Sequence, residues 1–139
     1  MESRKCGMRW VVRIDKGEEV VATLRRFCAE KGIRLGSVSG IGAADRVTLG
    51  YFETATKQYH TFERCGDHEI TALSGNVTTL NGEVYLHLHV TLSDQDCRAF
   101  GGHLSSALIS GTCELVIDEL EGGVDRQFNN EVGLNLLRF

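Results

Sequence analysis

The strongest constraint on the fold is the run of residues 84–92, in which aliphatic side chains alternate without a break with polar or aromatic ones. A period of two is typical of a β-strand whose two faces meet different environments. The aliphatic face is expected to lie in a core, and the other face carries His87 and His89. Side chains on one face stand roughly 6.6 Å apart at ~3.3 Å of rise per residue, so both imidazoles could bind one ion.

A third histidine follows in the segment Gly101-Gly102-His103-Leu104. Two glycines allow the backbone to pass close to a neighbour or to turn sharply, and either would bring His103 toward the pair. A His-x-His pair alone is more often the solvated side of a half-buried sheet than a metal site. The third histidine changes that balance, and we predict a metal site formed by His87, His89 and His103.

The remaining segments predict a largely antiparallel sheet with one main amphipathic helix. Residues 18–31 carry apolar side chains at helical spacing, and Gly32 is a typical C-terminal stop. Asn81-Gly82 is a strong turn signal that predicts a hairpin between residues 69–77 and the histidine strand. Further strands are expected at residues 8–14, 46–52, 57–62 and 113–120. We therefore expect a compact α+β fold, with residues 1–139 as a single domain.

Composition excludes several classes of protein. The formal net charge is -4 and basic residues are scattered, which makes direct binding to DNA doubtful because such binding depends on neutralising phosphates. The absence of proline excludes an AT-hook of the Arg-Gly-Arg-Pro type. The five cysteines are odd in number and lack Cys-x-x-Cys spacing, which argues against a disulfide framework and a thiolate zinc site. No apolar run approaches the ~20 residues of a membrane span, so we expect a cytoplasmic protein without a membrane partner.

Several segments, taken in this order, resemble the PPC domain, the "plants and prokaryotes conserved" family. The most specific are Leu86-His87-Leu88-His89 and Gly101-Gly102-His103-Leu104. The others are Gly17-Glu18, Gly40-Ile41-Gly42-Ala43, Glu69-Ile70, Ser74-Gly75-Asn76, Glu114-Leu115-Val116-Ile117 and Gly133-Leu134. The resemblance covers nearly the whole chain and implies a single-domain prokaryotic member, assembled as a homotrimer. It also implies a zinc site at the three motif histidines, His87, His89 and His103.

The resemblance implies a binding or regulatory module. In plants the domain follows AT-hooks that bind the DNA, and many prokaryotic members are described as predicted DNA-binding proteins by that association. This chain has no such hook, so the part of the family that suits DNA is missing. We expect a zinc-binding homotrimer that acts through partners, with a small-molecule ligand at the metal as a further candidate.

A metal-dependent enzyme is the alternative. Three imidazoles suit Zn²⁺, although copper and nickel also accept them. Three protein ligands and an open position would lower the pKa of a bound water to ~7 and create a nucleophile. Such chemistry would need a general acid or base, and Glu69 and Glu114 are the candidates by family motif, with Asp94 as a third by proximity. The sequence names no substrate.

Overall fold

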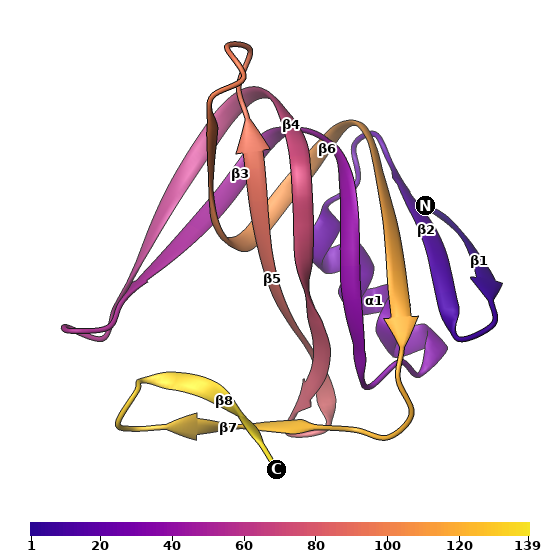
Figure 1. Ribbon diagram of the computed structural model, residues 1–139, viewed down its shortest axis with the longest axis vertical. Coiled ribbons are helices and arrows are strands. Elements are labelled where there is room, and N and C mark those ends of the chain that lie inside the picture. The colour runs from indigo at the N-terminus through magenta and orange to yellow at the C-terminus, as the bar shows by residue number, and fades with distance from the viewer.

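The structure is a computed structural model that describes residues 1–139, and it contains one helix and eight strands. The elements are β1 (Glu2–Cys6), β2 (Arg9–Asp15), α1 (Val20–Lys31), β3 (Gly36–Glu53), β4 (Gln58–Leu80), β5 (Glu83–Ser93), β6 (Ala99–Glu119), β7 (Asp125–Asn129) and β8 (Leu134–Arg138). The strands form one sheet in the order β1-β2-β6-β3-β4-β7-β8, with β5 paired to both β4 and β6 (Figure 1). All pairings are antiparallel except a single parallel contact between β4 and β7. The predicted antiparallel α+β fold with one helix is confirmed.

Four strands close into a ring. β3 pairs with β4 on one edge and with β6 on the other, and β5 joins the far edges of β4 and β6. The Asn81-Gly82 turn between β4 and β5 has positive φ at both residues, as a two-residue hairpin turn requires. The predicted hairpin of residues 69–77 with the histidine strand is therefore present, and the ring holds β5 against two neighbours.

Glycines allow the long strands to approach each other. The glycine-rich segment around Gly40 and Gly42 belongs to β3, and the register of β3 with β4 shifts between these two residues. A Cβ at Gly40 would stand 2.6 Å from the carbonyl oxygen of Glu114, and one at Gly42 would stand 2.8 Å from the Cα of Cys113. The absence of a side chain at these two glycines therefore allows β3 to lie close to β6.

Helix α1 covers one side of the sheet through its apolar stripe (Figure 1). It begins at Val20, later than predicted, because the Glu19 carboxylate caps it by accepting from the backbone N–H groups of Val21 and Ala22. The same carboxylate accepts the N–H of Ala107 and so ties the helix start to β6. Gly32 ends the helix in the left-handed conformation, with φ 70°.

The core is one cluster of buried apolar side chains. It includes the aliphatic face of β5, namely Leu86, Leu88, Val90 and Leu92. The buried face of α1 belongs to the same core. The alternation of residues 84–92 therefore forms the predicted strand: the aliphatic face lies in the core, and the face that carries the histidines points away from it. The single helix is too short and too polar to cross a lipid bilayer.

The C-terminal tail forms a hairpin that the sequence did not predict. β7 and β8 pair with each other and lie beyond the open end of the ring (Figure 1). The Lys57 ammonium, in the turn between β3 and β4, donates to the carbonyl oxygen of Asn130 in the β7–β8 turn at 2.9 Å. This bond joins two hairpins that are far apart in the sequence, and the space between them is where the histidines lie.

Candidate metal centre

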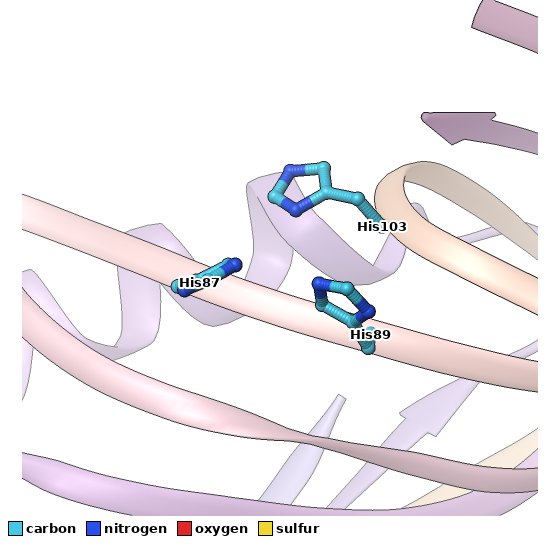
Figure 2. A group of neighbouring side chains, drawn as sticks. All are labelled: His87, His89 and His103. Carbon is cyan, nitrogen blue, oxygen red and sulfur yellow. The ribbon is translucent and has the colours of Figure 1, made fainter. Parts of the chain in front are cut away.

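Three histidines from two neighbouring strands converge on one point. His87 and His89 lie on β5, and His103 lies on β6 directly opposite His89. The ring centroids are separated by 5.3 Å, 5.3 Å and 5.5 Å. One nitrogen from each ring lies within 4.8 Å of the others, and Figure 2 shows the three rings gathered around a common space. This is the convergence that the sequence predicts.

The donor set fits a tetrahedral metal ion. Bonds of 2.0–2.1 Å to zinc place neighbouring nitrogens roughly 3.4 Å apart, which small rotations of the three side chains would reach. The rings are half-buried at His87 and His103 and exposed at His89, so an ion could enter from the solvent side. Three protein ligands leave a fourth position for water or for a small molecule.

Glycines hold the ligand strands close enough for this convergence. A Cβ at Gly101 would overlap the carbonyl oxygen of Val90 on β5, and one at Gly102 would stand 2.9 Å from the carbonyl oxygen of Gly50 on β3. On the other edge of β5, a Cβ at Gly75 would overlap the carbonyl oxygen of His87. The double glycine before His103 therefore serves close approach and not a sharp turn.

The site favours neutral imidazoles. Burial lowers the pKa of His87, and the positive charge of Arg126 and the neighbouring His89 lower it further. Burial, followed by the charges of His87 and His89, lowers the pKa of His103 to about 4. A neutral imidazole keeps a lone pair free, which is the form that binds a metal.

The histidines open into a cavity of about 780 Å³. Its walls come from β3, β4, β5, β6, β7 and β8. The aromatic and aliphatic part of the lining consists of Tyr51, Phe52, Tyr59, Tyr85, Leu134 and Leu136. The ring of Tyr59 packs edge-on against His103 with centroids 5.9 Å apart. Burial raises the pKa of Tyr59, so its phenol stays protonated in the cavity. The shape and lining are those of a site for a small molecule.

Sequence reasoning missed Arg126, which contributes to the same cavity. Its side chain is only 7% exposed, and its guanidinium lies 4.8 Å from the centroid of the Tyr85 ring. It donates to Thr78 Oγ1, to the Asn135 carbonyl oxygen and to Asn76 Oδ1. In the sequence Arg126 is one basic residue in a short polar segment, and only the position of the C-terminal hairpin reveals it.

The structure does not bring the predicted acid or base residues to the histidines. Glu69 is exposed and pairs with Ser93 at the end of β5, and Glu114 is exposed beside a separate depression lined by Val11 and Val116. Asp94 accepts from the backbone N–H and the guanidinium of Arg98. No aspartate or glutamate lines the cavity at the histidines.

Comparison with proteins of known structure finds close relatives of this fold. A protein from Bacteroides thetaiotaomicron, named as a candidate DNA-binding protein, superposes with a TM-score of 0.97 at 39% sequence identity, over 99% of this chain and 96% of that chain. A metal-containing protein from Archaeoglobus fulgidus has a TM-score of 0.90 at 33% identity, over 97% of this chain and 96% of that chain.

Among curated relatives, the bifunctional protein GlmU of Synechococcus sp. (strain JA-3-3Ab) is 34% identical over 119 residues. The match takes in 84% of this chain but only 18% of GlmU, so the chain spans less than a fifth of that relative's length. The sequence profile of the Plants and Prokaryotes Conserved (PCC) domain matches residues 1–121. Because this match covers most of the chain, the protein belongs to the Plants and Prokaryotes Conserved domain family, as its histidine and glycine motifs indicate.

Proposed function

We propose that this protein is a zinc-binding homotrimeric module that holds a small molecule at its three-histidine site and acts as a binding or regulatory protein. The observation that carries the proposal is the convergence of His87, His89 and His103 at the wall of an apolar cavity. A set of three imidazoles suits zinc, and copper or nickel are the competing ions. The relative from Archaeoglobus fulgidus is described as a metal-containing protein, which supports a bound metal in this chain.

The lining of the cavity favours binding over hydrolysis. A zinc hydrolase commonly uses a carboxylate near the metal-bound water as general base, and no aspartate or glutamate lines this cavity. The bound metal would supply Lewis acidity at its open position. The protein's own polar groups there include the hydroxyls of Tyr59, Tyr85 and Ser105, which suit orientation of a ligand by hydrogen bonds.

A metal-dependent enzyme remains the second candidate function. The observation in its favour is that three protein ligands leave a coordination position that faces a cavity large enough for a substrate. In that function the protonated phenol of Tyr59, which packs against His103, would be the proton donor. Turnover of any substrate that depends on the metal and on Tyr59 would favour this candidate.

An exposed apolar strip on the outer face of the sheet supports the homotrimer. Val11 of β2, Ile41 of β3 and Val116 of β6 are 49%, 59% and 38% exposed on three adjacent strands. Val11 and Val116 are direct cross-strand partners, and both line the same shallow depression as Ile41. Exposed apolar side chains that gather on neighbouring strands favour an interface between copies of the chain.

We infer that any role in transcription runs through protein partners. The relative from Bacteroides thetaiotaomicron carries a DNA-binding name, but the net charge of -4 in this chain opposes contact with phosphates. All five cysteines are free, which fits a reducing, cytoplasmic setting.

X-ray absorption at the zinc edge, on protein loaded with one zinc ion per chain, tests the proposed coordination. We expect three imidazole nitrogens at about 2.0–2.1 Å and one exchangeable oxygen ligand. A shell of four protein ligands would exclude a small molecule at the metal, and a shell of water oxygens alone would exclude the site.

A further inference from the structure

The cavity beside the histidines contains a buried positive charge without a negative partner. The three protein groups that accept from Arg126 are a hydroxyl, an amide oxygen and a backbone carbonyl, at 2.8–2.9 Å, and all are neutral. Arg126 forms no ion pair, and no carboxylate lines the cavity. The face of the Tyr85 ring, 4.8 Å away, compensates part of this charge, but burial without a negative partner remains costly, and an anionic ligand would offset that cost.

Holding the C-terminal hairpin explains the hydrogen bonds of Arg126 but not its charge. The bonds to Thr78 and Asn76 reach β4, and the bond to the Asn135 carbonyl reaches β8, so the side chain does link the hairpin to the ring. A neutral amide, which has two N–H groups, could donate only two of these three bonds, at a lower desolvation cost. A guanidinium has five N–H groups, and only three have protein acceptors here, which leaves two for a ligand.

The position of Arg126 in the cavity favours a negatively charged ligand. The guanidinium lines the same cavity as the three histidines, so a ligand in this cavity meets both groups. A divalent ion at the histidines would add two positive charges to the same space, which contains no acidic side chain. Such a space repels cations and strongly favours anions.

We propose that the cavity binds a small carboxylic acid with an apolar body, whose carboxylate accepts hydrogen bonds from Arg126. This inference rests on the proposed metal site and names the ligand class for it. Arginine pairs well with carboxylates, which accept two N–H groups at once. The apolar body of the acid would lie against the aromatic walls provided by Tyr51, Phe52 and Tyr85.

Calorimetric titration of the zinc-loaded protein with benzoate and benzamide tests the proposal, because these probes share shape and size but differ in charge. We expect benzoate to bind about tenfold or more tightly than benzamide, as a charged hydrogen bond in a buried site predicts. Arg126→Gln should weaken this preference, because only the zinc ion then remains as a positive charge in the cavity. The matched control is Arg98→Gln, at a side chain that is 74% exposed and does not line the cavity, and it should keep the preference.

Three results would overturn the proposal: equal affinity for the two probes in the native protein, no binding of benzoate at all, or an unchanged preference in Arg126→Gln. A third probe, phenylphosphonate, separates the anion classes, and tighter binding of it than of benzoate would make the carboxylate assignment wrong. Should Arg126→Gln fail to fold, Arg126→Lys replaces it and is expected to prefer benzoate still. Zinc is measured in every sample. Native protein that holds no zinc would contradict the proposed function, whereas zinc-loaded protein without the preference contradicts only this inference.

Discussion

His89 on β5 and His103 on β6 are direct cross-strand partners, with ring centroids 5.5 Å apart. Side chains of opposed residues on an antiparallel pair lie close by geometry, so this register alone brings two imidazoles together. His87, two residues along β5, lies on the same face and completes the trio. The register of one strand pair therefore decides whether the site exists.

Gly75→Ala tests the contact that positions β5. A Cβ at this residue would overlap the carbonyl oxygen of His87, so β4 and β5 must separate to admit it. We expect the free energy of unfolding to fall by roughly 1–3 kcal/mol, as overpacking does, and zinc affinity to weaken because His87 moves. Chemical denaturation and zinc titration measure the two effects. Gly123→Ala is the matched control, since a Cβ there meets nothing within 4 Å; equal losses in the two variants would contradict the assigned contact.

Substitutions on the two faces of β5 should affect different properties: one face determines stability and the other determines metal binding. Leu88 is 1% exposed in the core, so Leu88→Ala should lower the free energy of unfolding by about 2–5 kcal/mol while the folded protein still binds zinc. His89 is exposed, so His89→Ala should cost the metal-free protein little and weaken zinc binding strongly. Denaturant melts and zinc titrations of both variants give the answer. A His89→Ala protein that binds zinc like the native one would remove this residue from the ligand set.

Val116→Glu tests the proposed trimer interface. On assembly, a carboxylate at residue 116 would be buried beside Val11 and Ile41 and close to the carboxylate of Glu114, which lines the same depression. Light scattering of the native protein is expected to give three times the chain mass, and the variant is expected to be monomeric. Met8→Glu is the control, at a residue 48% exposed in the turn between β1 and β2. A variant that remains trimeric would place the interface elsewhere.

Short DNA duplexes should not bind to the native protein in a salt-dependent manner. With a net charge of -4, the chain has no excess of Lys and Arg side chains to displace counterions from DNA. The logarithm of the binding constant should therefore not change with the logarithm of the salt concentration, or binding should be undetectable at low salt. Fluorescence anisotropy across a salt series measures this. A steep negative slope would show phosphate contacts and would restore direct DNA binding as a function.

Local patterns predicted the parts of the fold that depend on neighbouring residues. The alternation in residues 84–92 predicted β5 and its faces, and Asn81-Gly82 predicted the turn that precedes it. The antiparallel sheet and the helix followed from the same kinds of pattern. The convergence of the three histidines was predicted as well, because two share a strand face and the third follows two glycines.

Contacts between distant segments could not be predicted in this way. The pairing of β5 with β6 depends on closure of the whole ring. No sequence pattern near His103 indicates that it pairs with His89. The C-terminal hairpin brings Arg126 to β4, fifty residues from Asn76, through contacts that have no sequence period. Glu69 and Glu114 were chosen by family motif, and the register of their strands places both away from the cavity.

Elemental analysis of the purified protein, with the His87→Ala variant as comparison, tests the central claim most directly. The account predicts close to one zinc ion per chain in the native protein and a loss of most of it in His87→Ala, while Leu88→Ala retains its zinc. Native protein with no bound transition metal after growth in metal-replete medium, or equal zinc in native and His87→Ala protein, would contradict it.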